Sequence, residues 1–216
     1  MSAGAARVPA DAALTPRARA KRDQIRAQAQ RLFLARGFAG TSTDAIAAEA
    51  GVSKQTLYAY YPSKEELLSD VLRHLIHEDP HHQLLAPDRV RAATAAEVRQ
   101  ALIALAQNLI ANVMQPDYLA LMRVVIAETP RLPQLGALFR AAVPEQVLGY
   151  VRSILEEGQA NGALAPLDTD AASRMLAGAL LTYALHDGLL VGDGPPRLPP
   201  PERVEAIVQL FMKLLA

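Results

Sequence analysis

The chain has 216 residues, 51% of them hydrophobic, which suffices for one large or two small domains and excludes an intrinsically disordered protein. It contains no cysteine, which excludes disulfides and thiolate metal sites, and no apolar run reaches the roughly 18 to 20 residues of a membrane span. The net charge is zero, but residues 1–64 carry ten Lys and Arg against four acidic residues, a net +6 that the remainder balances. This asymmetry favours a polyanionic partner of the N-terminal region, the alternative being a chance fluctuation.

The first third of the chain predicts a tail followed by short helices. Residues 1–16 are rich in Ala without periodicity, and we expect a disordered N-terminal tail, with no secretory signal. From about Arg17, apolar residues recur on one helical face until Gly37 and Gly40 interrupt the pattern. Ser42 or Thr43 caps a second helix, which Gly51 ends. Two further helices are expected at residues 52–60 and 63–77, the last beginning with the capping box of Ser63 and Glu66.

The rest of the chain also predicts helices, with no alternation typical of strands. Capping residues and prolines mark where the helices start. The expected ranges are 94–115, 116–128, 133–142, 144–162, 169–188 and 201–215. The predicted fold class is therefore all-α.

The segment around Gly51 has the pattern of a helix-turn-helix. Two helices that cross closely need a small residue at the contact, which Ala47 provides, and a turn residue that tolerates positive φ, which Gly51 provides. Val52 and Leu57 would hold the pair together by apolar contact. The polar residues of the second helix then face outward, as the docking of a recognition helix in a DNA groove requires.

Each outward group has a use at a DNA duplex. Lys54 and Gln55 lie near the helix N-terminus, which normally meets base edges, and Thr56 can contact thymine or a donor. The hydroxyls of Tyr58 and Tyr60 can reach phosphates, and Thr43 and Lys64 lie at helix starts that favour anions. The candidate DNA-binding residues are Thr43, Ser53, Lys54, Gln55, Thr56, Tyr58, Tyr60 and Lys64.

The sequence TSTDAIAAEAGVSKQTLYAYYPSKEELL, residues 41–68, resembles the DNA-binding domain of TetR-type transcriptional regulators. The chain departs from the family pattern at Tyr61, where Phe is usual, and at Gln55, where a small residue is common. The resemblance implies a helix-turn-helix domain at residues 17–62, a connecting helix at 63–77, and a helical ligand-binding and dimerisation domain at 78–216. It further implies a cytoplasmic, ligand-responsive repressor that binds a palindromic double-stranded DNA operator as a homodimer.

The dimer contacts are expected in the last two helices, where small residues permit close approach; intramolecular packing is the alternative for residues 171–190. The final helix offers Val204, Ile207, Val208, Leu210, Phe211 and Leu214. A small, mostly hydrophobic effector is expected because the helices are rich in Leu, Ala and Val. Its candidate contacts are the bulky or polar residues Met122, Arg123, Tyr150, Tyr183 and His186, each of which also has an ordinary structural interpretation.

Other functions find less support in the sequence. His74, His77 and Glu78 have a helical spacing that can bind a metal, in a segment that also holds Asp79, His81 and His82. A polar helix end before Pro80 is the preferred interpretation, and we expect no metal or cofactor. No nucleophile elbow, HExxH or phosphate-binding Gly loop indicates an enzyme. A helical interaction module without DNA binding would lack Lys54, Tyr58 or Lys64, and all three are present.

Overall fold

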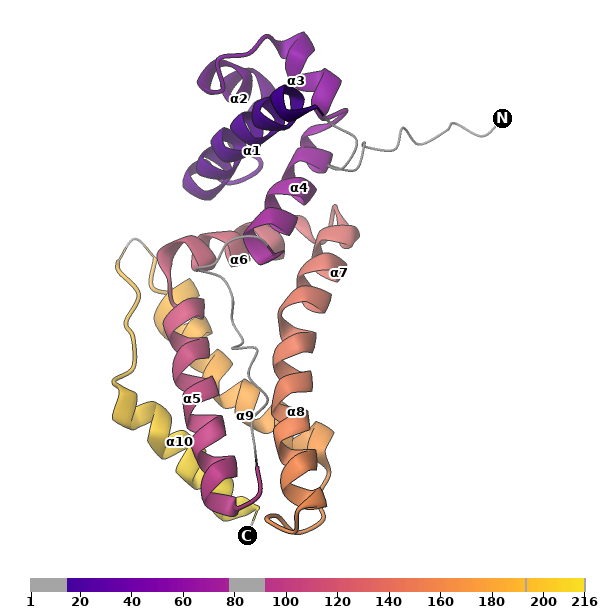
Figure 1. Cartoon of the computed structure of the whole chain (residues 1–216). Helices are drawn as coiled ribbons and strands as arrows, with labels where there is room; N and C mark the ends of the chain where they lie inside the picture. The colour runs from indigo at the N-terminus through magenta and orange to yellow at the C-terminus, as the bar shows by residue number, and fades with distance from the viewer. Residues whose placement is uncertain (1–14, 78–91, 193, 216) are drawn as a thin grey trace. The chain divides into compact units, whose positions relative to one another are not determined.

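The computed structural model describes residues 15–77, 92–192 and 194–215, and the regular secondary structure in these ranges is helical (Figure 1). The all-α fold class is confirmed. Most of the expected tail (1–14) and part of the histidine-rich segment (78–82) lie outside the described residues. Within the described ranges no single helix is long and apolar enough to cross a membrane, although the bent pair Ala95–Val113 and Pro116–Glu128 meets the same criterion jointly.

By its internal contacts the chain divides into two compact units. The first comprises Met1–Glu78 with Val124–Gly136, and the second comprises Asp79–Arg123 with Ala137–Ala216. Helix α6 (Pro116–Glu128) therefore contributes residues to both units. The sequence predicted a single division near residue 78 and did not anticipate that Val124–Gly136 groups with the N-terminal residues.

The first unit begins with helices whose starts are capped by hydroxyl side chains. The helices are α1 (Pro16–Arg36), α2 (Thr43–Glu49), α3 (Lys54–Tyr60) and α4 (Lys64–His77). The side chains of Thr15, Ser42, Ser53 and Ser63 each accept a hydrogen bond from a backbone N–H three residues on. These bonds satisfy donors that the first turn of a helix leaves free, so local sequence sets the boundaries.

The turn between α2 and α3 depends on Gly51, whose φ of 59° lies in the left-handed region. The Gly51 N–H donates to the Ala48 carbonyl at 3.1 Å, and the Val52 N–H donates to the Ala47 carbonyl at 3.0 Å. This pair of bonds is a Schellman motif, which closes a helix and redirects the chain. The predicted turn residue is thereby confirmed.

The core of the first unit fixes α3 in place. Helix α1 packs against α2 and α4, and α2 packs against α3. The largest fully buried side chains of this unit are Tyr61, Phe33, Ile25, Ile46, Leu57, Leu67, Leu68, Leu72 and Leu75. Burying each of the aliphatic ones contributes about 1.5–3 kcal/mol. Because Leu57 on α3 is inaccessible, the opposite side of α3 must face solvent.

The second unit is a bundle of longer helices. In addition to part of α6, it contains α5 (Ala95–Val113), α7 (Pro133–Ala142), α8 (Pro144–Ala160), α9 (Thr169–Tyr183) and α10 (Pro201–Leu214). Part of α7 belongs to the first unit. Helix α5 packs against α8, α9 and α10, and α8 packs against α9 (Figure 1). A capping box begins α5: the Thr94 side chain accepts the Glu97 backbone N–H, and the Glu97 side chain accepts the Thr94 backbone N–H.

One predicted helix differs in kind from the expectation. Residues 169–188 were expected to form one α-helix, but α9 gives way to a π-helical segment at Ala184–Leu189. Gly188 lies so close to α6 that an added Cβ would be 2.8 Å from the Leu119 side chain. The Arg123 guanidinium donates to the Gly188 and Leu189 carbonyls at 3.1 and 3.3 Å. These contacts accompany the wider turn, and no local sequence signal indicates them.

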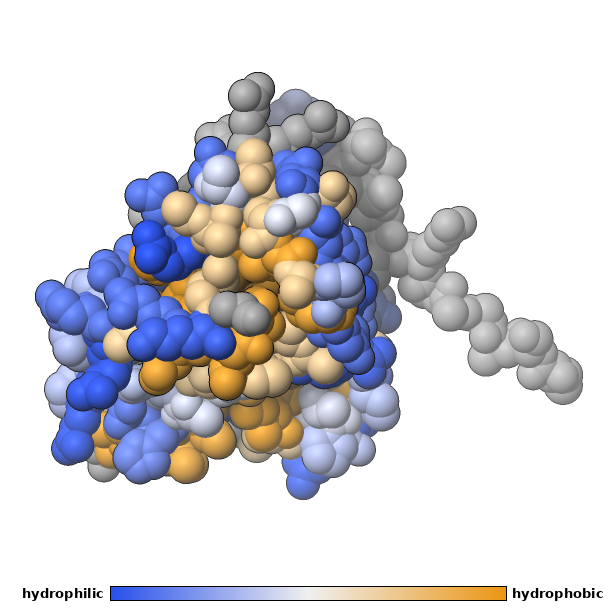
Figure 2. All heavy atoms as spheres, turned by 90° about the horizontal axis from the view of Figure 1, so that it is seen from below, coloured by the Kyte–Doolittle hydropathy of each residue, from blue (hydrophilic) through white to orange (hydrophobic). Residues whose placement is uncertain are grey.

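Helix α10 divides its apolar residues between the core and the surface. Val204, Val208 and Phe211 are buried, whereas Leu210 and Leu214 are 62% and 71% exposed. The apolar residues of α10 were all expected in a dimer interface. This expectation is corrected for Val204, Val208 and Phe211, because the helix packs against α5 and α9 within the same chain. The end view in Figure 2, from the side where α10 terminates, shows hydrophobic residues gathered centrally with hydrophilic residues along the borders.

Candidate nucleic-acid interface and cavity

Helix α3 presents a polar face to solvent. Its seven residues begin after the cap Ser53, and within them Leu57 is fully buried. Lys54 and Gln55 are exposed, and Tyr58 is 40% exposed. The structure therefore gathers these three predicted residues on one accessible face, with Tyr60 half-buried at the end of the helix.

Two pairs of hydroxyl groups organise this face. The Ser53 Oγ lies 2.8 Å from the Thr56 Oγ1 and also accepts the Thr56 N–H at 3.0 Å, so both belong to the helix cap. The Thr43 Oγ1, at the first turn of α2, lies 3.3 Å from the Tyr58 hydroxyl on α3. Hydroxyls from two helices thus meet on one exposed surface, from which a hydroxyl can donate a hydrogen bond to a phosphate oxygen.

Lys54 has a partner that sequence reasoning missed. Its ammonium lies 2.8 Å from Oδ1 of Asp44 on α2, and the hydrogen bond to this carboxylate raises the pKa of Lys54 above its ordinary value. Both side chains are more than half exposed. Solvent screens an exposed pair of this kind, so Lys54 can exchange Asp44 for a DNA acceptor at little cost.

Lys64 is more engaged within the protein than its predicted role as a phosphate contact suggests. Its ammonium donates to the Phe38 carbonyl at 2.8 Å and to the Thr41 carbonyl at 2.9 Å. It also lies 4.0 Å from the centroid of the Phe38 ring. Lys64 therefore fastens the loop between α1 and α2 to the start of α4, and one of its three N–H groups remains for another acceptor.

A buried ionic cluster joins the end of α3 to α4 and α1. The Tyr61 hydroxyl donates to Oδ2 of Asp70 at 2.7 Å, and the Arg22 guanidinium donates to Oδ1 of Asp70 at 2.8 Å. Arg22 Nε also donates to the Tyr61 hydroxyl at 3.3 Å, and Arg26 lies 3.7 Å from Asp70. The pKa of Tyr61 is raised, mainly by burial and secondly by the negative charge of Asp70. The phenol therefore stays neutral and donates its hydrogen bond.

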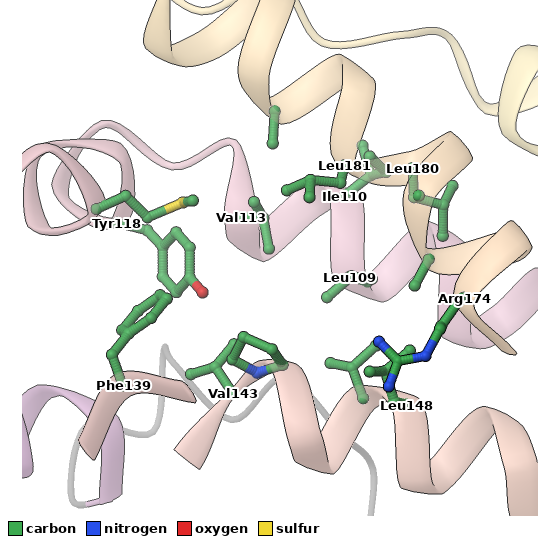
Figure 3. A pocket seen from close by; sticks show the side chains of 16 residues that line it. Leu109, Ile110, Val113, Tyr118, Phe139, Val143, Leu148, Arg174, Leu180 and Leu181 are labelled. Carbon is green, nitrogen blue, oxygen red and sulfur yellow. The ribbon is translucent and has the colours of Figure 1, made fainter. Parts of the chain in front are cut away.

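The second unit contains a cavity of about 310 Å³ between α5, α6, α7, α8 and α9 (Figure 3). This volume lies at the lower end of the range of about 300–1,000 Å³ for small-molecule sites. The lining is mostly aliphatic: Leu109, Ile110, Val113, Met122, Val143, Pro144, Val147, Leu148, Ala177, Gly178, Leu180, Leu181 and Ala184, with Tyr118, Phe139 and Arg174 as the exceptions. A lining of this kind suits an apolar molecule.

Of the five residues predicted to contact an effector, Met122 lines this cavity and the others do not. Arg123 instead bonds the carbonyls at the end of the π-helical segment. The His186 side chain is 84% exposed and pairs with Asp187. Tyr150 and Tyr183 are half-buried outside the lining. Tyr118, Phe139 and Arg174 were missed, because the sequence does not indicate which helical faces enclose a cavity.

No group of three or more potential metal ligands occurs in the part of the chain that the structure describes. His74 and His77 lie within that part, at the end of α4, whereas Glu78, Asp79, His81 and His82 lie outside it, so the metal-site hypothesis is not tested.

Comparison with known proteins identifies the family. The sequence model for the C-terminal domain of AefR-like transcriptional repressors matches residues 100–214, which is more than half of the chain. The model for the tetR family of bacterial regulatory proteins matches residues 25–71, which include α2 and α3. The chain belongs to the TetR family. The resemblance noted for residues 41–68 is thereby confirmed.

Individual relatives agree with this assignment. The chain is 36% identical over 86 residues to the uncharacterized HTH-type transcriptional regulator YvaF of Bacillus subtilis (strain 168), covering 40% of this chain and 45% of that protein. The chain thus spans less than half the length of this curated relative.

Several solved structures resemble nearly the whole chain, and two of them show the agreement. A TetR-family transcriptional regulator from Mesorhizobium loti MAFF303099 is 26% identical, with a TM-score of 0.69 over 94% of this chain and 97% of the other. The flavonoid-responsive regulator FrrA is 28% identical, with a TM-score of 0.68 over 91% of this chain and 95% of the other. This TetR-family chain is a DNA-binding transcriptional regulator.

Proposed function

We propose that this TetR-family protein is a repressor that binds a palindromic operator as a homodimer and leaves it when a small, mostly hydrophobic effector binds. The observation that carries the DNA-binding part is the exposed face of α3. Lys54, Gln55 and Tyr58 face solvent while Leu57, on the opposite side, is buried. A helix held in this way can enter the major groove, about 12 Å wide.

The contacts on this face divide into two roles. Lys54 and Gln55, at the N-terminal end of α3, are proposed to meet base edges, Gln at adenine and Lys at guanine, with Thr56 beside them. Thr43, Ser53, Tyr58 and Tyr60 are proposed to bind phosphate oxygens, which fix the register without reading sequence. For Lys64, the one N–H not bonded to a loop carbonyl is available for a phosphate.

Dimerisation through the last two helices is supported by their surface. Met175, Leu181 and Leu185 are each close to half exposed, and Leu210 and Leu214 of α10 are more so. An apolar surface of this extent favours a partner, and a second copy would bury the same residues in a two-fold interface. Two recognition helices on one DNA face would then need centres about 34–36 Å apart.

The cavity of the second unit is proposed to hold the effector. Tyr118 and Met122 line it from α6, and the same helix continues into residues of the first unit. An effector releases DNA only if it binds the DNA-incompetent state more tightly. The proposed response is therefore a displacement of α6 and α4 that misplaces the recognition helices.

A gel shift on DNA fragments selected by the protein from its genome tests the proposal. Affinity should fall by about 10³-fold or more between 50 and 200 mM salt if several phosphates are neutralised. Extracted hydrophobic metabolites should release the DNA. A protein that selects no fragments above background would contradict the proposal.

A further inference from the structure

The cavity has a polar group at each end, and this distribution constrains its ligand. Figure 3 shows Tyr118 and Phe139 at one end and Arg174 at the other, with aliphatic side chains between them. Arg174 is the one charged residue among the lining residues that the structure describes. Among the described residues that line the cavity there is no carboxylate, so an anionic ligand would meet no repulsion from these side chains.

The Arg174 guanidinium has N–H groups that are available to a ligand. Its Nε donates to Oδ2 of Asp170 at 3.0 Å, and within the described residues its two terminal nitrogens have no hydrogen-bond partner. Its side chain is 65% exposed, which places it at the mouth of the cavity rather than in its depth. A guanidinium presents its terminal N–H groups in a planar fork that matches a carboxylate.

The surroundings of Arg174 keep a positive balance. Asp170 is shared, since Arg152 on α8 also donates to its Oδ1 at 2.7 Å. Two guanidinium groups therefore share one carboxylate. The pKa of Asp170 is lowered, and the hydrogen bond from Arg174 is the largest cause. The Arg152 Nε–H is buried and lacks a hydrogen-bond partner among the described residues. Arg152 does not line the cavity, so its part is to share the Asp170 carboxylate with Arg174.

The other end of the cavity is neutral. The Tyr118 hydroxyl points into the cavity, and its ring lies 6.2 Å from that of Phe139. Burial raises the pKa of Tyr118, so the phenol carries no charge. This end suits an uncharged part of a ligand, with the aromatic rings as contacts and the Tyr118 hydroxyl as a neutral polar group.

We propose that the effector is an amphipathic carboxylic acid, with its hydrocarbon or aryl body along the aliphatic walls and its carboxylate at Arg174. This inference rests on the proposed function, in which the same cavity holds the effector. A carboxylate suits the terminal N–H groups of Arg174, whose partner Asp170 is shared with Arg152. The charge of Arg174 disfavours a cationic amphiphile of the same shape.

Decanoic acid and decan-1-ol, which share one hydrocarbon body, provide the test by titration calorimetry on the full chain. The acid should bind the wild type about twofold to fivefold more tightly than the alcohol, the range expected for a partly exposed charge pair. Arg174→Gln should abolish this preference and change alcohol affinity less than twofold, whereas Arg174→Lys should keep part of it. Arg140→Gln, an exposed arginine outside the lining, is the matched control and should change neither affinity.

Equal affinity for acid and alcohol in the wild type would overturn the inference while leaving the cavity as the effector site. Persistence of the acid preference in Arg174→Gln would also overturn it. Binding of neither compound would reject the cavity as a site for such amphiphiles, and with it the inference. A gel shift with the same preparation reports separately on the DNA-binding part of the proposed function.

Discussion

The Tyr61 hydroxyl donates a 2.7 Å hydrogen bond to the Asp70 carboxylate, inside a cluster completed by Arg22. Tyr61 follows α3 directly and Asp70 lies on α4, so one buried contact joins the residue after the recognition helix to the next helix. Phe is usual at position 61 in the family, and Phe cannot make this bond. The hydroxyl therefore adds a tie between α3 and α4 that the family pattern does not predict.

Tyr61→Phe should lower the free energy of unfolding by about 1–3 kcal/mol, because the Asp70 carboxylate loses a buried donor. Asp70→Asn should cost more, about 3–5 kcal/mol, since it leaves Arg22 buried without its ionic partner. Urea unfolding followed by circular dichroism measures both. Tyr58→Phe is the matched control: it removes an exposed hydroxyl and should change stability by less than about 0.5 kcal/mol. Equal effects of Tyr58→Phe and Tyr61→Phe would refute the importance of the cluster.

Gly51→Ala should destabilise the protein by about 1 kcal/mol, because its φ of 59° is strained for an L side chain while a Cβ there meets no atom within 4 Å. Gly51→Asn should cost less, since Asn tolerates this conformation. Gly149→Ala in α8 is the control, with equally open space but helical backbone, and should stabilise by about 0.5–1 kcal/mol. Thermal unfolding measures the stability of these variants. If Gly51→Ala were as stable as the wild type, the positive φ at this position would not constrain the residue.

Asp44→Asn should tighten DNA binding about twofold to tenfold, because it frees the Lys54 ammonium and removes a negative charge from the surface proposed to face phosphates. The midpoint of unfolding should hardly change, since the pair is exposed and screened by solvent. Glu145→Gln, which breaks the exposed pair with Arg140, is the control for loss of a carboxylate elsewhere. Fluorescence anisotropy with a labelled fragment measures affinity, and weaker binding by Asp44→Asn would mean that Asp44 positions Lys54 productively.

Lys64→Ala should lower stability by about 1–2 kcal/mol and weaken binding to all DNA sequences alike, because the loop before α2 loses its two bonds to the ammonium. Lys64→Met retains the apolar stem over Phe38 but not the donors, and separates packing from hydrogen bonding. Urea unfolding and anisotropy on several fragments report the two effects. Full stability with lost affinity would assign Lys64 to phosphate binding alone.

The sequence predicted the helices well because their ends are local. Ser53 caps α3 and Pro116 and Pro133 begin α6 and α7 at the expected positions, since a cap or a fixed φ needs no distant partner. The exposed position of Tyr58 was likewise predictable, because tyrosines at 58, 60 and 61 cannot all face inward on one helix.

The cavity and the ionic contacts could not be read from the sequence for the opposite reason. Arg174 and Tyr118 lie 56 residues apart, and only the packing of α6, α8 and α9 brings them to one cavity. The bonds from Lys64 to the Phe38 and Thr41 carbonyls depend on a loop conformation that composition does not specify. Arg123 lies on α6 as expected but turns to the π-helical segment, which no pattern indicates.

Selection of bound sequences from random DNA, with wild type, Gln55→Ala and Tyr58→Phe in parallel, tests the central claim that the exposed face of α3 reads the operator. The account predicts a two-fold symmetric consensus for the wild type. Gln55→Ala should change base preference at one position in each half-site, and Tyr58→Phe should keep the consensus at reduced affinity. A consensus unaltered by Gln55→Ala and by substitution of Lys54, or none for the wild type, would contradict it.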